Sequence, residues 1–258
     1  MLIPPKHFFI VGAQRSGTTY LYRLLYDHPE IEMAHPERPE PKFFLIDRLY
    51  ARGLDYYYAE FFPQGGTGKL LGEKSTSYIE SEKSAMRIVQ HFPDAKIVMV
   101  LRNPVERAVS NYWFSFNNGF EKLSLEDAIY QEEQRRENYD HEQISASPYA
   151  YLKRGRYIDY IEGYEKHVAP ANIKVLIYEQ LTEESSALAD LFEFLGVSPD
   201  FAPSVQSDQR VNASDREPVK ISSDLQRYMQ DYFSESNQCL AVRLNLDLER
   251  WWSGAKGQ

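Results

Sequence analysis

The segment FFIVGAQRSGTTYLYRLL, residues 8–25, decides the fold of this chain. Phe8–Val11 is a short apolar run rich in aromatic and β-branched residues, which predicts a strand buried on both faces. A glycine-containing turn follows, and residues 18–29 then predict a helix that ends before Pro29. A strand, a glycine-containing turn and a helix in this order commonly bind phosphate groups. The segment therefore predicts an anion-binding loop in an α/β protein.

This loop departs from the common nucleotide-binding pattern G-x-x-x-x-G-K-[ST], in which a lysine follows the second glycine. Gly12 and Gly17 keep the spacing, but Thr18 occupies the lysine position and Arg15 lies inside the loop. The backbone N–H groups of residues 14–19 can converge at the start of the helix, where the helix dipole favours an anion. The residues expected to bind a phosphate or sulfate group are Gln14, Arg15, Ser16, Gly17, Thr18 and Thr19.

The composition is that of a soluble globular protein large enough to bury a core. The chain has 258 residues, of which 43% are hydrophobic and 26% are charged. Its formal net charge of −9 disfavours a broad nucleic-acid-binding surface, although a local cationic pocket is compatible with it. Cys239 is the only cysteine, so the sequence predicts no internal disulfide and no cysteine-based metal site.

The N-terminal sequence MLIPPKHFFIVG enters the first expected strand almost at once. We therefore expect no signal peptide, and no apolar run approaches the length of a membrane span. These features predict a cytoplasmic protein without a membrane-spanning helix. The sequence does not indicate an oligomeric state.

A second strand–loop–helix unit occupies KIVMVLRNPVERAVSNYWFSF, residues 96–116. Lys96–Leu101 predicts a strand, Asn103 is a suitable helix cap, and Pro104 suits the first helical position. A short strand is also expected near Leu70 and Leu71. The chain thus repeats the local arrangement of its first segment.

A third strand is expected at IKVLIY, Ile173–Tyr178, before a helix with Thr182 as its cap and Gly196 at its end. The three prolines in HPERPEPKFF, residues 35–44, predict an extended or turning loop. Strands that alternate with helices predict an α/β fold with a central parallel sheet flanked by helices.

Residues 131–148 are polar throughout. They predict either a frayed helix followed by a mobile lid or a solvated connection, because long polar loops serve both purposes. We find no internal repeat and no clear domain boundary, so we expect a single domain over residues 1–258.

A second anion site is suggested by LRNPVERAVSNYW. Arg102 follows the strand at its carboxyl end, where open α/β sheets place their ligands. Ser110 lies two helical turns into the next helix, and Arg107, three residues earlier, is expected on about the same face. Arg102 and Ser110 could bind a second phosphate. For each residue alone, a surface arginine or a helix-facing serine is the simpler interpretation.

Together the two motifs resemble the sulfotransferases that use 3′-phosphoadenosine 5′-phosphosulfate (PAPS). GAQRSGTT is similar to their 5′-phosphosulfate loop, and RNPVERAVSNY is similar to their 3′-phosphate segment. PEPKFF and GEKSTSYI resemble segments of the heparan-sulfate-type branch. YIDYIEGYEKHVAPANIKVLIYEQL and NQCLAVRLNLDLERWW resemble related bacterial members. The resemblance covers most of the chain and implies a P-loop NTPase-like sulfotransferase fold.

The resemblance implies in-line transfer of a sulfuryl group from PAPS to a hydroxyl or amine, which leaves adenosine 3′,5′-bisphosphate (PAP). A sulfuryl group carries less negative charge than a terminal phosphoryl group, so fixed cations and backbone donors can replace Mg²⁺, and no metal is expected. Arg15 would stabilise the leaving 5′-phosphate in place of the lysine that many members carry. Unlike lysine, arginine cannot donate a proton.

By the same resemblance, Glu40 in EPKFF matches the family's catalytic glutamate, the general base that takes the acceptor's proton. Pro39 and Pro41 would stiffen the loop that carries it, and Pro39 replaces a lysine that is frequent in the family. Three other residues remain possible bases, namely Glu37, His35 and His7.

Lys74, in GEKSTSY, maps onto a lysine expected near the acceptor and the sulfuryl group, where it would hold a positive charge beside Glu40. Thr76 stands where the family often has proline, which leaves the local turn open. Family members also contact the 3′-phosphate or the adenine from a late loop, and Arg210 in SDQRVNAS is the best match for that role.

Two other functions compete with this interpretation. A P-loop kinase would need a lysine at Thr18 and a magnesium-binding acid after another strand, and Glu179 is the only acid so placed. A non-catalytic nucleotide-binding module would need neither Glu40 nor Lys74, so the presence of both argues against it.

The acceptor remains open at the level of sequence. Similarity to the heparan-sulfate branch favours a glycan. An acidic protein suits a polyanionic glycan poorly unless its cleft is locally basic, so a small hydroxylated metabolite is an equal alternative. Phenols, lipids and carrier-bound hydroxyacyl chains are also compatible with the motifs.

Overall fold

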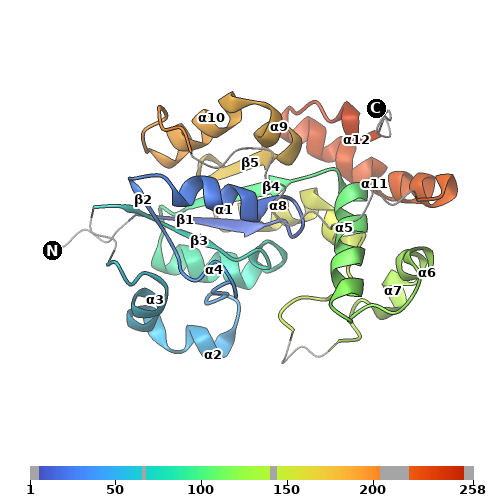
Figure 1. Cartoon of the computed structure of the whole chain (residues 1–258), viewed down its shortest axis with the longest axis horizontal. Helices are drawn as coiled ribbons and strands as arrows, with labels where there is room; N and C mark the ends of the chain where they lie inside the picture. The colour runs from blue at the N-terminus through green and yellow to red at the C-terminus, as the bar shows by residue number, and fades with distance from the viewer. Residues whose placement is uncertain (1–5, 66–67, 140–143, 204–220, 253–258) are drawn as a thin grey trace. The chain divides into compact units, whose positions relative to one another are not determined.

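The computed structural model describes residues 6–65, 68–139, 144–203 and 221–252 (Figure 1). The chain divides into two compact units. One comprises Met1–Leu101 and Gly163–Val211, and the other comprises Arg102–Glu162 and Asn212–Gln258. The single domain expected over residues 1–258 stays a prediction.

The first unit contains a five-stranded parallel sheet in the order β2-β3-β1-β4-β5. Its strands are β1 (His7–Gly12), β2 (Ile31–Met33), β3 (Leu70–Lys74), β4 (Lys96–Leu101) and β5 (Ile173–Ile177). The predicted α/β fold and the four predicted strands are confirmed. The edge strand β2 was missed, because three residues are too few to show a period. Since all strands are parallel, β3, β1 and β4 end side by side at one edge of the sheet.

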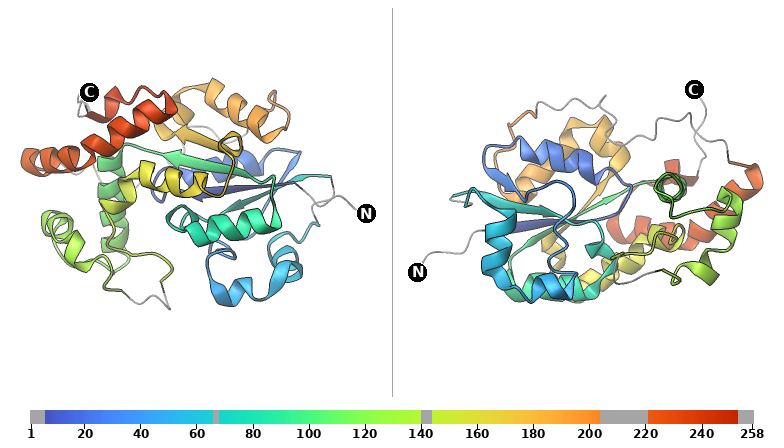
Figure 2. Two further views of the ribbon diagram at one scale, coloured as in Figure 1. Left: turned by 180° about the vertical axis from the view of Figure 1, so that it is seen from behind. Right: turned by 60° about the horizontal axis from the view of Figure 1, so that its bottom comes forward.

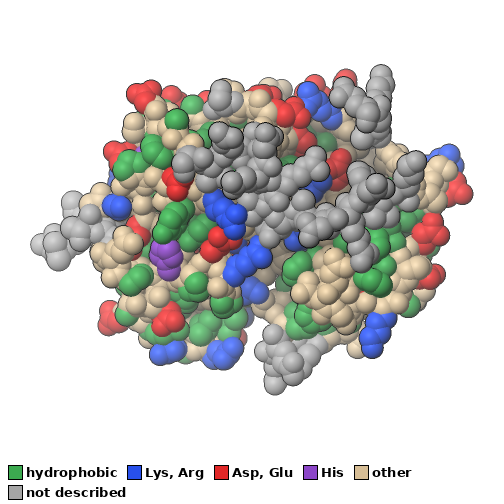
Figure 3. All heavy atoms as spheres, in the orientation of Figure 1, with side chains coloured by type: hydrophobic (Ala, Val, Ile, Leu, Met, Phe, Trp, Pro, Cys, Tyr) green, Lys and Arg blue, Asp and Glu red, His purple; other side chains and the backbone are tan. Residues whose placement is uncertain are grey.

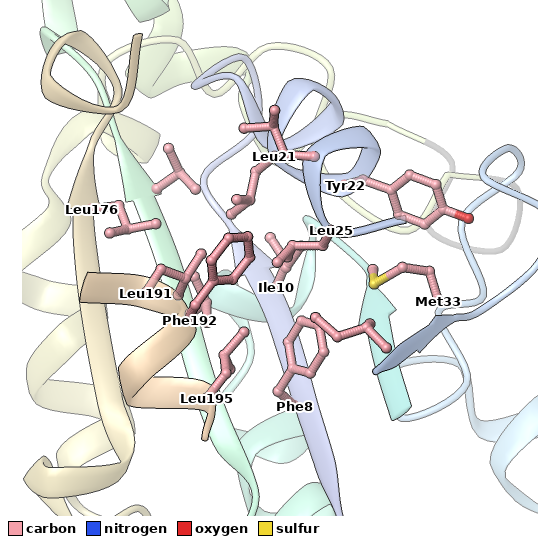
Figure 4. Packing of buried hydrophobic residues seen from close by; sticks show 14 of the residues in the cluster. Phe8, Ile10, Leu21, Tyr22, Leu25, Met33, Leu176, Leu191, Phe192 and Leu195 are labelled. Carbon is pink, nitrogen blue, oxygen red and sulfur yellow. The ribbon is translucent and has the colours of Figure 1, made fainter. Parts of the chain in front are cut away.

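Helices cover both faces of this sheet. They are α1 (Thr18–Tyr26), α2 (Asp47–Tyr50), α3 (Gly53–Phe61), α4 (Glu82–His91), α9 (Tyr178–Glu183) and α10 (Ser185–Leu195), with the 3₁₀ turns η1 (Tyr78–Glu80) and η3 (Pro170–Asn172). On one face, Leu21 and Leu25 of α1 and Phe192 of α10 pack over β1 (Figure 4). Helix α4 covers the opposite face (Figure 2), where Phe9 contacts Phe44. Burial of each such side chain contributes about 1.5–3 kcal/mol.

The second unit is helical. Its elements are α5 (Pro104–Asn117), α6 (Leu125–Tyr130), α7 (Glu132–Arg135), η2 (Lys153–Gly155), α11 (Ser223–Leu244), α12 (Glu249–Trp252) and most of α8 (Tyr157–Glu165), which continues past Glu162 into the first unit. Its core joins α5 and α11 through buried Ala108, Met229 and Phe233. The predicted start of α5 is confirmed. Asn103 accepts hydrogen bonds from the next residues' N–H groups, and Pro104 is the first helical residue.

The predicted cap at Thr182 is wrong. The chain turns from β5 directly into the short helix α9, so Thr182 lies inside that helix and its hydroxyl donates to the carbonyls of Tyr178 and Glu179. Glu184 precedes α10 instead. The predicted end of that helix is confirmed at Gly196, whose φ of 74° is readily adopted by glycine.

The polar segment 131–148 begins with α7, as a frayed helix would. Residues 140–143 lie outside the described part of the chain. The proposal that this segment is a lid therefore stays a prediction.

Candidate functional site

The loop between β1 and α1 has the backbone of an anion-binding turn. Arg15 and Gly17 have φ values of 67° and 85°, and left-handed residues in a short loop turn successive N–H groups towards one concavity. A side chain at Gly17 would also place its Cβ 2.2 Å from the ring of Tyr178, so glycine is required on two grounds. No side chain caps α1, and its first turn contains no acidic residue. Its N-terminus thus suits an anion.

The hydroxyl-bearing residues of this loop are buried. The side chain of Ser16 is fully buried, and within the described residues its Oγ has no hydrogen-bond partner. A buried unpaired hydroxyl is costly, and an oxyanion would satisfy it. Thr18 and Thr19 are also buried. The side-chain amide of Gln14, which has two N–H donors, gives one hydrogen bond to Ser77 Oγ at 3.1 Å.

Beside this loop, the end of β3 holds the carboxylate of Glu40. Lys74, the last residue of β3, brings its Nζ within 3.1 Å of Glu40 Oε1. The N–H of Thr76 donates to Glu40 Oε2 at 2.9 Å, and the Thr76 hydroxyl lies 2.9 and 3.1 Å from the two carboxylate oxygens. The structure thus brings together Glu40 and Lys74, as the sequence predicted. A proline, which the family often has at this position, has no N–H and could not make the first of these bonds.

A second carboxylate, Glu73, lies on the buried side of β3 with only 1% exposure. It accepts hydrogen bonds from Ser75 Oγ at 2.7 Å and from Tyr57 OH at 2.8 Å. Burial raises its pKa from 4.5 to about 7, while hydrogen bonds from Ser75, Tyr78 and Tyr57 oppose that rise. Glu73 is therefore the acid in this region whose protonation changes near neutral pH.

The backbone just after Glu40 is tied to this buried network. The N–H of Lys42 donates to Ser75 Oγ, and the N–H of Phe44 donates to the hydroxyl of Tyr78, both at 2.9 Å. On the outer side, Arg87 of α4 donates to the carbonyl of Phe44 at 3.2 Å. Hydrogen bonds thus connect residues 42–44 to Ser75, Tyr78 and α4.

The three competing bases are less well placed. Glu37 pairs with Arg23 at 3.4 Å. His7 begins β1, at the amino end of the sheet and away from the strand ends that carry the loop. His35 packs edge-on against the ring of Tyr26. Among the four candidates, Glu40 alone has a lysine partner at the carboxyl end of a strand.

The second predicted anion segment begins the second unit. Arg102 follows β4 directly along the chain, and its Nη2 donates to Glu106 Oε2 at 2.7 Å. Its side chain is 27% exposed, and its carbonyl accepts a hydrogen bond from Tyr157 OH at 2.8 Å. Ser110 is half-buried in α5. Arg102 thus keeps a partly exposed guanidinium that pairs with an acid of the helix following it.

Arg107 and Ser110 lie three residues apart in α5 but differ in burial. The side chain of Arg107 is fully buried and donates to Asn111 Oδ1 at 3.1 Å and to the carbonyl of Tyr151. A guanidinium so enclosed by acceptors stabilises the helical unit instead of binding a ligand.

Arg210 and the rest of SDQRVNAS lie outside the described residues. Within the described ranges, no group of three or more His, Cys, Asp or Glu side chains could hold a metal ion. The same ranges contain no helix that is both long and apolar enough to span a membrane. On the face seen in Figure 3, several Lys and Arg side chains gather near the middle, so local positive charge accompanies the net charge of −9.

Sequence reasoning missed the donors of Thr76 and the buried partners of Glu73. A possible signal was the run of polar residues GEKSTSY at the end of an otherwise apolar strand. Polar residues that follow a buried strand are expected to face either a ligand or a buried partner. This polar segment alone does not predict the hydrogen-bond partner of each of its residues.

A parallel sheet with an anion-binding turn after its central strand defines a P-loop-like α/β protein. A family model described as the sulfotransferase domain matches residues 5–236. The chain belongs to the sulfotransferase family. The predicted family is thereby confirmed.

Known relatives agree with this assignment. The chain is 32% identical over 213 residues to the human bifunctional heparan sulfate N-deacetylase/N-sulfotransferase 3, covering 76% of this chain and 23% of that protein. It is 39% identical over 103 residues to the human heparan sulfate glucosamine 3-O-sulfotransferase 6, covering 40% of this chain and 28% of that protein. It thus spans about a quarter of the length of these curated relatives.

Solved structures show the same fold. A sulfotransferase from Alicyclobacillus acidocaldarius is 28% identical, with a TM-score of 0.79, and the match covers 97% of this chain and 99% of that one. A mouse sulfotransferase complexed with PAP is 16% identical, with a TM-score of 0.57 over 90% of this chain and 85% of that one. At that identity the mouse structure supports the fold alone.

Proposed function

We propose that this chain transfers a sulfuryl group from PAPS to a hydroxyl or amine of an acceptor, leaving PAP. The observation that carries the proposal is the carboxylate of Glu40, held by Lys74 and Thr76 at the edge of the sheet where the anion-binding loop begins. Membership of the sulfotransferase family supports it. A binding module would have no use for a base fixed in this way.

In this proposal, residues 14–19 bind the 5′-phosphosulfate of the donor. The left-handed backbone at Arg15 and Gly17, the uncapped start of α1 and the buried hydroxyl of Ser16 all suit an oxyanion. The guanidinium of Arg15 would add charge where the departing phosphate develops it. Arg102 and Ser110, together with Arg210, would bind the 3′-phosphate and the nucleoside.

The transfer step is an in-line displacement at sulfur. The acceptor oxygen or nitrogen forms a bond to sulfur while the bond between sulfur and the 5′-phosphate oxygen breaks. The acceptor's proton passes to Glu40, and the bond electrons leave with the phosphate as part of PAP. Lys74 lies 3.1 Å from Glu40, so one ammonium group would balance the carboxylate before transfer and could face the sulfuryl oxygens.

The acceptor in this proposal is a glycan or a small hydroxylated metabolite. Similarity to relatives named for heparan sulfate and its glucosamine supports a glycan. The net charge of −9 favours a neutral acceptor over a polyanionic one, because a polyanion would be repelled except at a locally basic surface.

The test combines a binding measurement with a transfer assay. PAP should raise the thermal midpoint without any metal, whereas ATP should stabilise the protein only if it is a kinase, and then with Mg²⁺. Transfer of labelled sulfate from PAPS to a panel of neutral glycans, sulfated glycans and hydroxylated metabolites then identifies the acceptor. Magnesium-dependent binding of ATP without binding of PAP would overturn the proposal.

A further inference from the structure

The carboxylate of Glu40 has no means of orientation from its own neighbours. It lies in the irregular segment 35–44, and the residues on both sides of it, Pro39 and Pro41, have no N–H to donate. The hydrogen bonds that direct this carboxylate come from another part of the chain. Thr76, 36 positions away, supplies an N–H and a hydroxyl, beside the ammonium group of Lys74.

We propose that Thr76 is a positioning residue of this site, and that its N–H and hydroxyl set the direction in which Glu40 meets the acceptor. The inference rests on the proposed function, because it assumes that Glu40 receives the acceptor's proton. Thr76 contacts Glu40 and is 8% exposed, so its role is exerted through that carboxylate.

The bonds from Thr76 leave a defined place for the acceptor. An ionised carboxylate offers about four lone-pair positions. Lys74 takes one of them, and the N–H and hydroxyl of Thr76 take two more. About one position then remains for an acceptor hydroxyl, and the Glu40 side chain keeps 15% exposure through which it can be reached. Without the Thr76 donors, the Glu40 carboxylate could rotate, and the lone-pair position that faces the acceptor would no longer be fixed.

Thr76 is itself held on both sides, so it can act as a fixed reference. The N–H of Ser75 donates to the carbonyl of Ile10 in β1 at 3.1 Å, which extends the sheet by one bond beyond β3. On the other side, the N–H of Tyr78 donates to the carbonyl of Ser75 at 3.0 Å and closes the turn around Thr76. Preorganised donors of this kind cost little to align during a reaction.

Three substitutions at this position remove the donors in steps. Thr76→Ser keeps both donors and should leave kcat within about threefold of the wild type. Thr76→Val has nearly the same shape but lacks the hydroxyl, so kcat should fall by roughly tenfold, as expected for one hydrogen bond to a charged group. Thr76→Pro lacks both donors and should lower kcat by roughly a hundredfold. The Kd for PAP should stay within about twofold throughout, since none of the changes touches the anion-binding loop.

A double substitution separates positioning from general stability. If Thr76 acts through Glu40, then adding Thr76→Val to Glu40→Gln should lower the residual rate by less than about twofold, because the group being positioned is already lost. Thr182→Val is the matched control. It removes a hydroxyl that bonds to backbone carbonyls inside α9, and it should leave kcat and the Kd for PAP unchanged.

The outcomes distinguish this inference from the proposed function. A wild-type protein that transfers no sulfate to any acceptor would overturn both. A wild-type protein that transfers sulfate, with a Thr76→Val variant of equal kcat, would overturn the role of Thr76 alone. A loss of PAP affinity parallel to the loss of kcat, or a full tenfold effect of Thr76→Val on top of Glu40→Gln, would show a structural role and overturn it equally.

Discussion

The ends of β3 and β4 carry similar polar side chains but use them differently. After β3, Thr76 bonds to a carboxylate 36 positions away along the chain. After β4, Arg102 forms an ion pair with Glu106, four positions further along the chain in α5. The first arrangement is buried and links separate segments, whereas the second is exposed and local. Of the two, only the arrangement after β3 brings together residues that lie far apart in the sequence.

The two regions also differ in the energetic cost of leaving a polar group without its partner. Lys74 is 2% exposed and Glu73 is 1% exposed, so each needs a fixed partner to be tolerated. The carboxylate of Glu106 is 48% exposed, and water can replace its partner at little cost. Substitutions at the end of β3 should therefore have large effects, and those at the end of β4 smaller ones.

The strongest test of the site after β3 is Glu40→Gln. Loss of a general base typically lowers the rate by two to four orders of magnitude, so we expect kcat to fall by about a thousandfold. The Kd for PAP, measured by calorimetry, should change by less than about twofold, because glutamine keeps the size of the side chain. Glu37→Gln is the control and should retain most activity, since Glu37 pairs with Arg23. An equal loss of activity and PAP binding would contradict the assignment of the base.

The second test concerns the buried acid beneath that site. Because the pKa of Glu73 is raised from 4.5 to about 7, the folded protein holds this proton more tightly than the unfolded chain does. Its contribution to stability is therefore complete below about pH 4.5 and is lost as the pH rises through about 7. The Glu73→Gln side chain cannot ionise, so the variant should not lose this contribution. As the pH rises from about 4.5 through 7, the wild-type free energy of unfolding should therefore fall by about 3 kcal/mol relative to that of the variant.

Urea denaturation of both proteins between about pH 5 and pH 8 measures this difference. The control is Asp47→Asn. Lys83 and Arg87 lower the pKa of the exposed Asp47 through hydrogen bonds, so its contribution to stability does not change over that range. A stability difference between wild type and Glu73→Gln that is independent of pH would show that burial does not raise the pKa of Glu73.

The same contrast explains how much the sequence could predict. Asn103 as a cap, Pro104 at the first helical position and the strand before them follow from local chemistry, and all three are confirmed. The glycine-containing turn between β1 and α1 was also predicted, since its glycine spacing is local, and its binding of an anion stays a prediction. The short strand β2 was missed, and the cap assigned to Thr182 was wrong. Packing against the sheet decides both features.

The site after β3 could be predicted only in part. Resemblance to a known family paired Glu40 with Lys74, and the structure brings these two residues together. Nothing in the sequence indicated that Thr76 would donate two hydrogen bonds to Glu40. Contacts across 36 positions depend on how the irregular segment 35–44 lies over the strand ends, which no local pattern encodes.

The third test addresses Arg102 at the end of β4. If its guanidinium binds the 3′-phosphate, then Arg102→Ala should weaken PAP binding by roughly ten- to a hundredfold, the effect of losing a charge-assisted hydrogen bond. Binding of adenosine 5′-phosphate, which has no 3′-phosphate, should change by less than about twofold. Calorimetry with the two nucleotides measures the difference. An equal effect on both would show that Arg102 does not recognise the 3′-phosphate.

The smallest expected effect is that of Glu106→Gln, which removes the acid that pairs with Arg102 at 2.7 Å. An exposed ion pair at this spacing contributes about 0.3–0.5 kcal/mol, so an anion that binds Arg102 should bind about twofold more tightly without it. The gain should shrink as salt is raised, because exposed charges are screened within about 10 Å at 0.1 M ionic strength. Glu133→Gln, which removes a comparable exposed pair with Arg136, should leave PAP binding unchanged. Weaker PAP binding in Glu106→Gln would mean that the ion pair orients Arg102 for the nucleotide, and the end of β4 would then resemble the end of β3 after all.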